Sequence, residues 1–157
     1  MLFIFLEGIV VKIEVKTISD LTAQEFCQIA QERIKVFVVE QNCPYQEIDE
    51  LDEAAYHLLL KNDQNNLVGY TRIINKNAKP ITFGRVLVPK QYRSHQYGRL
   101  LVQATIEKAQ ELFPNQSIQI QAQAYLENFY HSFGFEPIFD VYLEDGIPHL
   151  NMKLGVD

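Results

Sequence analysis

Residues 86–99 read Val86-Leu87-Val88-Pro89-Lys90-Gln91-Tyr92-Arg93-Ser94-His95-Gln96-Tyr97-Gly98-Arg99. The first three residues of this stretch end an apolar run, residues 81–88, which predicts a strand that stops at Pro89. After a short turn, the pattern of residues 97–113 predicts a long helix, which ends before Pro114. The stretch therefore predicts a strand, a tight turn and a helix in direct succession.

This turn has the chemistry of a phosphate site. The first turn of a helix carries unpaired N–H groups and a partial positive charge, and both favour an anion. Gly98 permits a close approach of the backbone to a ligand. Arg93 and Arg99, with Lys90 nearby, can pair with phosphate oxygens, although the chain as a whole is acidic. The alternative is an ordinary strand–helix connection with surface arginines, and this segment alone leaves both open.

The rest of the chain predicts a mixed α/β domain. Residues 12–18 alternate polar and apolar side chains as a strand does, and Thr22-x-x-Glu25 is a capping box that opens a helix. We expect that helix to bury one face, made of Phe26, Ile29, Ala30, Ile34 and Phe37. The later segments are predicted to be a hairpin of residues 57–61 and 67–74, a strand at 117–124, a short helix at 126–133 that Gly134 caps, and a final hairpin of residues 141–143 and 149–154. The sum is an α/β fold, an α+β sandwich around one sheet.

Size and composition exclude several classes of protein. The 157 residues fit one domain, which we place at residues 12–157, with residues 1–11 as an N-terminal extension or an extra strand. A net charge of −6 disfavours binding to nucleic acid. The apolar start, residues 1–6, is too short for a membrane helix, which needs roughly 18 residues. The two cysteines make no disulfide framework and the four histidines show no metal-ligand spacing, so we expect a cytoplasmic protein without a metal.

Two stretches resemble the GNAT superfamily of N-acetyltransferases. Arg93-Ser94-His95-Gln96-Tyr97-Gly98 is similar to the pyrophosphate loop of that family, whose pattern is Arg/Gln-x-x-Gly-x-Gly/Ala. The chain departs from the pattern at Gln96, where the family usually has glycine. Residues 128–135 resemble the helix and the Gly-Phe step that follow the splayed fifth strand of the family.

A third match is more particular. Residues 37–45 and 144–149 look like the signature runs of the ElaA-like branch of this family, and the order of elements matches over residues 12–154. The resemblance implies the GNAT fold, a mixed and mostly antiparallel sheet with splayed central strands, flanked by helices. It also implies direct transfer of an acetyl group from acetyl-CoA to a primary amine of a small molecule or a peptide. It does not identify the acceptor.

The resemblance further implies roles for particular residues. Pantetheine would hydrogen-bond to the backbone of Val86, Leu87 and Val88 between the splayed strands, and Asn128 would touch the pantetheine or the pyrophosphate. Tyr130 would protonate the departing CoA thiolate, although its place on an apolar helix face also suits a core tyrosine. The loop that holds the pyrophosphate would comprise Arg93, Ser94, His95, Gln96, Tyr97, Gly98 and Arg99.

The acceptor side is less defined. As the base we favour Glu40, which ends an apolar run where the chain leaves its helix, while His57 and His149 are rivals that also suit structural histidines. Residues 47–53 hold five acids and, in this fold, border the acceptor. They could form a negative rim that attracts a cationic amine, or simply a solvated acidic loop. We expect Asp49, His57 and His149 to contact the acceptor.

Three other classes stay open. A domain of this kind could bind acyl-CoA without transferring anything, in which case no amine would release a thiol. Acyl-homoserine-lactone synthesis is a related acyl transfer, and Arg33-Ile34-Lys35-Val36-Phe37 resembles that family slightly, but the chain has no tryptophan and residues 93–98 favour CoA. A pure interaction protein would bind no CoA. A homodimer through sheet edges or C-terminal strands is compatible with the resemblance.

Overall fold

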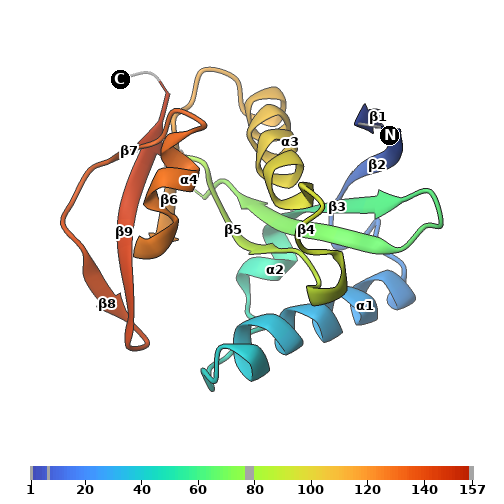
Figure 1. Cartoon of the computed structure of the whole chain (residues 1–157), viewed down its shortest axis with the longest axis horizontal. Coiled ribbons are helices and arrows are strands. Elements are labelled where there is room, and N and C mark those ends of the chain that lie inside the picture. The colour runs from blue at the N-terminus through green and yellow to red at the C-terminus, as the bar shows by residue number, and fades with distance from the viewer. Residues whose placement is uncertain (1, 7, 77–79, 156–157) are drawn as a thin grey trace.

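The computed structural model describes residues 2–6, 8–76 and 80–155 (Figure 1). Residues 1 and 7 of the expected N-terminal segment, and residues 77–79 and 156–157 of the expected domain, lie outside the described residues. The elements in chain order are β1 (Leu2–Leu6), β2 (Ile9–Lys16), α1 (Ala23–Arg33), the π-helix η1 (Ile34–Glu40), α2 (Leu51–Ala54), β3 (Tyr56–Asn62), β4 (Leu67–Ile74), β5 (Thr82–Leu87), the 3₁₀-helix η2 (Lys90–Tyr92), α3 (Tyr97–Leu112), β6 (Ile118–Gln123), the 3₁₀-helix η3 (Ala124–Leu126), α4 (Glu127–His131), β7 (Glu136–Pro137), β8 (Tyr142–Glu144) and β9 (Ile147–Leu154).

Two antiparallel sheets form the centre of the structure. The first has the strand order β1-β2-β3-β4-β5, and the second has the order β6-β9-β7, with β8 also paired to β9. In the described part of the chain they meet at one isolated parallel bridge, between Ile81 and Ile118. The expected sheet is therefore split where β5 and β6 diverge. This confirms the predicted fold, a mostly antiparallel sheet with splayed central strands and flanking helices.

Helices cover both faces of the first sheet, with α3 on one side and α1 on the other (Figure 1). The alternation within β3 explains this, because successive side chains of a strand point to opposite faces. Leu58 and Leu60 are buried with Leu101 of α3, whereas Leu59 is buried with Ile29 of α1. A third apolar cluster packs α3 and α4 against the second sheet.

The N-terminal segment contains a strand. β1 pairs antiparallel with β2, and β2 begins at Ile9 and ends at Lys16 rather than spanning residues 12–18 as predicted. The strand ends early because a turn follows, in which the Thr17 hydroxyl donates to the Asp20 carboxylate at 2.9 Å. The first sheet therefore gains an extra edge strand ahead of the predicted domain start.

The buried face of the first helix differs from the prediction. α1 begins at the expected capping box, and Ile29 is buried as expected. Ile34 is instead 41% exposed, and the next buried residues are Arg33 and Val36. The reason is that Arg33 follows Ile29 by four residues and so lies on the same face of α1, whereas Ile34, five residues after Ile29, lies off that face. From Ile34 onward α1 continues as the π-helix η1.

Arg33 is the largest departure from the apolar face that the sequence predicts. Its Nε donates to Glu47 at 2.9 Å and its Nη1 donates to Asp52 at 2.6 Å. The side chains of the three residues are 0%, 3% and 4% exposed, respectively. Burial alone would raise the pKa of Asp52, but the hydrogen bond from Arg33 and its neighbouring charges outweigh burial and lower that pKa to about 2. Buried ion pairs thus fasten the loop before β3 to α1.

The other predicted elements are confirmed to within two residues. β3 and β4 form the expected hairpin, and β8 and β9 form the expected final hairpin. Gly134 follows α4 with φ +100°, and its N–H donates to the His131 carbonyl at 2.8 Å, as a helix cap does. The elements that frame the gap between β5 and β6 therefore follow from the sequence pattern.

Replacing Arg33 with methionine should lower the free energy of unfolding by about 3–5 kcal/mol, because Glu47 and Asp52 would stay buried without this cation. Urea denaturation followed by circular dichroism measures the change. Lys35→Met is the control, since Lys35 is exposed and its replacement should cost less than about 0.5 kcal/mol. A loss below about 1 kcal/mol for Arg33→Met would contradict the prediction.

Candidate active site

The site begins where β5 and β6 separate. The Ile81 N–H donates to the Ser117 carbonyl at 3.0 Å, and the Gln119 N–H donates to the Ile81 carbonyl at 2.8 Å. Beyond this bridge, within the described residues, β5 pairs with β4 and β6 pairs with β9, but the two strands do not pair with each other. Their facing edges therefore keep backbone N–H and C=O groups that no sheet partner uses.

A cavity of about 700 Å³ lies between the two strands. Residues 82–88 line it along β5 and residues 120–123 line it along β6. The three predicted pantetheine contacts, Val86, Leu87 and Val88, are among the lining residues. An extended ligand can thus lie in the gap alongside the backbone of β5.

A bulge shapes the β5 side of this cavity. β4 advances two residues, from Tyr70 to Arg72, while β5 advances three, from Leu87 to Gly84. Arg85, inside the bulge, has φ +51°, a left-handed conformation that costs a residue other than glycine roughly 1 kcal/mol or more. The bulge takes Arg85 and its neighbour out of the regular pairing with β4, so their backbone groups can serve a ligand in the cavity.

The predicted phosphate loop leads directly into α3. Ser94 and Gln96 have φ +67° and +65°, and residues of this kind turn backbone N–H groups toward one hollow that suits an anion. Gln96 accepts a backbone hydrogen bond from Leu100, so the N–H groups of residues 97–99 come before the first intrahelical partner. A Cβ built on Gly98 would come no closer than 4.0 Å to another segment, so the space above this backbone is open.

A second cavity, of about 340 Å³, lies over this loop. It is lined by Val88, Tyr92, Arg93, Ser94, Gln96, Tyr97, Gly98, Arg99 and Phe129. His95 is not among the lining residues, and its Nδ1 donates to the Arg93 carbonyl at 2.8 Å. The structure thus brings six of the seven predicted loop residues together around this cavity. Asn128, the other predicted contact of the cofactor, is exposed and lines neither cavity.

Arg93 and Glu40 contact each other. Arg93 donates from Nη1 to Oε1 of Glu40 at 2.6 Å and from Nη2 to Oε2 at 3.0 Å, and its Nε donates to the Val88 carbonyl. The hydrogen bond from Arg93 lowers the pKa of Glu40 below its usual range. The expected base is therefore joined to the expected phosphate ligand, and this contact weakens Glu40 as a proton acceptor.

Tyr130 projects from α4 to the first cavity. Its side chain is 5% exposed and lines that cavity, and no described residue forms a hydrogen bond with its hydroxyl. Burial, with Tyr125 nearby, raises the pKa of Tyr130 well above its usual range. The hydroxyl is therefore protonated at neutral pH and is available to donate a hydrogen bond to a group in the cavity.

In the acidic stretch, residues 47–53, three of the five acids pair with arginines, whereas Glu50 and Glu53 are exposed. Asp49 lines the cavity but accepts from Arg72 Nη1 at 2.7 Å, and Glu47 pairs with Arg85 Nε at 2.8 Å. Burial would raise the pKa of Asp49, but the hydrogen bond from Arg72 outweighs it and lowers that pKa. Arginines thus neutralise most of the charge that was expected to attract a cationic amine.

His57 does not reach the cavity, which corrects its assignment as an acceptor contact. It is 0% exposed, with Nδ1 at 2.6 Å from the Tyr70 hydroxyl and Nε2 at 3.0 Å from the Asp52 carbonyl. Burial lowers the pKa of His57, so the ring is neutral. Nε2 must then donate to the carbonyl while Nδ1 accepts from Tyr70, and neither nitrogen is free for a substrate.

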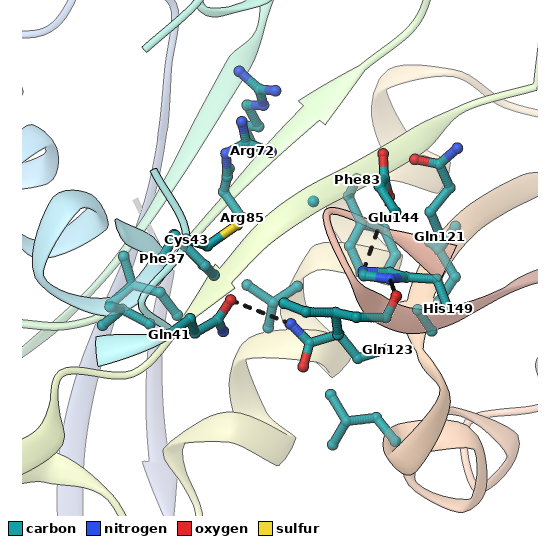
Figure 2. Close-up of a pocket in the computed structure, with 18 of the residues that line it drawn as sticks. Phe37, Gln41, Cys43, Arg72, Phe83, Arg85, Gln121, Gln123, Glu144 and His149 are labelled. Carbon is teal, nitrogen blue, oxygen red and sulfur yellow. Dashed lines mark hydrogen bonds and ion pairs between the residues drawn. The ribbon is translucent and has the colours of Figure 1, made fainter. Parts of the chain in front are cut away.

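His149 has the opposite placement. Figure 2 shows its ring in the cavity between Glu144 and Gln123. Gln123 also reaches across the cavity, where its Nε2 lies 3.5 Å from Oε1 of Gln41 (Figure 2). The hairpin of β8 and β9 thus supplies one wall, and the end of η1 supplies another.

Sequence reasoning missed two arginines of the site. Arg72 and Arg85 both line the cavity, yet each lies within a strand that reads as apolar. A charged residue inside a buried strand is itself a signal, because arginine is almost never fully buried without a partner. The acids of residues 47–53 were the complementary signal, although the pairing needed the fold.

Three further observations bear on the expectations from composition. Among the described residues, no group of three or more His, Cys, Asp or Glu side chains is arranged to hold a metal ion. In the same part of the chain, no helix combines the length and the apolar character needed to cross a membrane. Cys27 and Cys43 are both free thiols.

The chain is similar to known proteins along nearly its whole length. A family model described as an acetyltransferase (GNAT) domain matches residues 18–156. The chain is 43% identical over 143 residues to the protein ElaA of Escherichia coli K12, covering 88% of this chain and 92% of that protein. The crystal structure of Escherichia coli ElaA gives a TM-score of 0.85 at 38% identity, covering 91% of this chain and 98% of that one. An acyl-CoA N-acyltransferase from Pseudomonas aeruginosa gives a TM-score of 0.87 at 34% identity, covering 92% of this chain and 99% of that one.

Replacing Gln96 with glycine should raise the free energy of unfolding by about 0.5–1 kcal/mol, because glycine adopts φ +65° without the steric cost that glutamine has. Urea denaturation of the ligand-free protein measures the gain. Gln96→Ala is the matched control, since it removes the amide but keeps Cβ and should give no gain. Equal losses in both variants would mean that the glutamine side chain, not the backbone angle, decides the stability of the loop.

Proposed function

The chain belongs to the GNAT acetyltransferase family, as the sequence resemblance predicted, and on this premise we propose that it is an N-acetyltransferase that uses acetyl-CoA. The acetyl group would pass directly to a primary amine of a small molecule or a peptide, within one ternary complex. The family itself supports a transferase that depends on acyl-CoA. The acetyl donor and the amine acceptor are the parts that we propose.

One observation carries the proposal, namely the divergence of β5 and β6 with a cavity between them. This cavity and the one over the α3 loop share Val88 and Arg93 in their linings, so the two adjoin. The pair suits a ligand with an extended polar arm and a diphosphate at one end. The arm would lie along β5, and the diphosphate would meet the N–H groups of residues 97–99, where a helix N-terminus favours an anion.

The bulge of β5 supports the chemical step. Attack on a thioester develops negative charge on its carbonyl oxygen, and a preorganised backbone N–H at that point is often the largest catalytic contribution. Val86, beside Arg85 in the bulge, is outside the regular ladder with β4. We therefore assign the stabilisation of the oxyanion to the backbone around Val86.

Two proton transfers complete the reaction. A lysine-like amine has a pKa of about 10.4, so making it neutral at pH 7 costs roughly 4–5 kcal/mol and calls for a base. The departing thiolate must gain a proton. We assign this second transfer to Tyr130, because its side chain lines the cavity and its hydroxyl has no hydrogen-bond partner among the described residues.

Calorimetry with acetyl-CoA, followed by an assay of thiol release, tests the function. We expect acetyl-CoA to bind one site per chain and to raise the melting temperature, because a ligand that binds only the folded state stabilises it. Spermidine, an aminoglycoside, free amino acids and a lysine peptide are the acceptors to screen. Binding without thiol release for any amine would favour the alternative, a module that binds acyl-CoA without catalysis. Absence of binding would contradict both.

Tyr130→Phe should lower turnover at least tenfold while acetyl-CoA still binds and the fold persists, because the variant loses the proton donor and little else. Turnover is measured by thiol release and binding by calorimetry. Tyr56→Phe is the matched control, since Tyr56 is half-buried but lies outside the cavity, and its turnover should stay within twofold of the original. Unchanged turnover in Tyr130→Phe would remove Tyr130 from the mechanism.

A further inference from the structure

The hairpin of β8 and β9 presents a histidine and a carboxylate to the cavity. His149 lies opposite Tyr142 of β8 on one side and opposite Gln123 of β6 on the other. Leu150 is buried in the core, so its neighbour His149 points to the opposite face of the sheet, toward the cavity. Glu144, which also lines the cavity, is the nearest carboxylate to this ring (Figure 2).

The hydrogen bonds of His149 assign its tautomer. Nδ1 lies 2.7 Å from the Ile147 carbonyl oxygen. A carbonyl oxygen only accepts, so Nδ1 carries the hydrogen and donates it. In the neutral ring, Nε2 then holds the lone pair, and no hydrogen bond from a described residue occupies that lone pair. The neutral ring therefore offers a proton acceptor to the cavity.

The other two candidate bases lack this property. Glu40 is bound through both carboxylate oxygens to Arg93, which lowers its pKa. His57 is buried outside the cavity, and both of its ring nitrogens are already hydrogen-bonded. Of the three candidates, His149 alone combines a free acceptor nitrogen with a place on the cavity wall.

We propose that His149 is the general base that takes the proton from the acceptor ammonium, and that Glu144 is the positioning residue that stabilises the imidazolium. This assignment rests on the proposed function and deepens it. Nε2 of His149 and Oε2 of Glu144 are 3.9 Å apart, close enough for the carboxylate to favour a positive charge that forms on the ring. The same carboxylate, with Asp145 in the adjoining turn, attracts the ammonium before transfer.

His149 removes one proton from the acceptor ammonium, and the freed electron pair of the nitrogen forms a bond to the thioester carbonyl carbon. The carbon–sulfur bond then breaks, and the sulfur takes a proton from Tyr130. The nitrogen gives up its second proton, which restores Tyr130 through solvent, and the imidazolium releases the first proton to water. An ammonium and an acyl thioester thus give an amide, a free thiol and one proton.

His149→Gln tests the assignment, because glutamine keeps a polar side chain but cannot act as a base. We expect kcat at pH 7 to fall about 100-fold or more, with acetyl-CoA affinity within twofold of the original. The assay uses acetyl-CoA with spermidine or with the best acceptor of the screen. The deficit should shrink at least tenfold between pH 7 and pH 9, because the neutral fraction of an amine with a pKa of about 10.4 rises roughly 100-fold over that range. The titratable groups that adjoin His149 are Glu144, Asp145 and Tyr142, whereas β6 contributes the neutral Gln121 and Gln123.

Matched variants separate catalysis from structure. Glu144→Gln should lower kcat about three- to tenfold, and added imidazole should restore part of the rate of His149→Ala. His131→Gln is the control, since His131 is a largely exposed histidine of α4 that lines neither cavity, and its kcat should stay within twofold. Glu40→Gln should not reproduce the pH-dependent deficit.

Two results would overturn the assignment while leaving the proposed function intact. One is a His149→Gln variant that keeps more than a third of the original kcat. The other is that kcat falls at pH 7 and recovers at pH 9 in the Glu40→Gln variant but not in the His149→Gln variant. If the original protein binds acetyl-CoA but acylates none of the amines, the proposed function fails, and the assignment fails with it.

Discussion

The site depends on two backbone hydrogen bonds at Ile81, because they fix the point from which β5 and β6 diverge. Ile81 and Ile118 are 0% and 1% exposed, so the bridge between the two strands is held inside the apolar core. Beyond the bridge, in the part of the chain that the structure describes, β5 and β6 do not pair with each other. If β5 and β6 continued to pair, their backbone N–H and C=O groups would bond to each other and no cavity would remain between them. The bulge at Arg85 adds to this by releasing β5 from β4 as well. The reactive region is therefore built from backbone that the sheets leave unpaired.

A second constraint holds the wall that faces this gap. The segment between η1 and β3 contains only the short helix α2, so regular backbone pairing does little to hold it. Three arginines, Arg33, Arg72 and Arg85, fasten it through Glu47, Asp49 and Asp52. Removing one partner of a buried ion pair leaves the other charge unpaired in a medium of low dielectric constant. Loss of any one of these arginines would therefore destabilise the whole segment. The charges that look like a substrate attractant in the sequence therefore serve chiefly to position the loop.

The sequence predicted most of the framework, because strand alternation, helix periodicity and breaks at Pro89, Pro114 and Gly134 are local signals. The burial of Arg33 was not predictable in this way, since its partners lie 14 and 19 residues away in the chain. The distinction between His57 and His149 also needed the structure. Both are strand residues, and a shift of one position decides whether such a side chain enters the core or the cavity. Glu40 and Arg93 are 53 residues apart in the chain, so no local sequence pattern could predict that they form an ion pair.

The left-handed angles of Ser94 and Gln96 bear on how such loops are found in other chains. A glycine in a sequence pattern is a proxy for a torsion that glycine adopts freely, and a glutamine held in the same torsion presents the same amide hydrogens. A search for the loop motif alone would therefore pass over a chain like this one, although a family model that spans the whole domain still matches it. Searches that score the sign of φ along the loop would retrieve it, and would reject glycine-bearing loops that are extended instead.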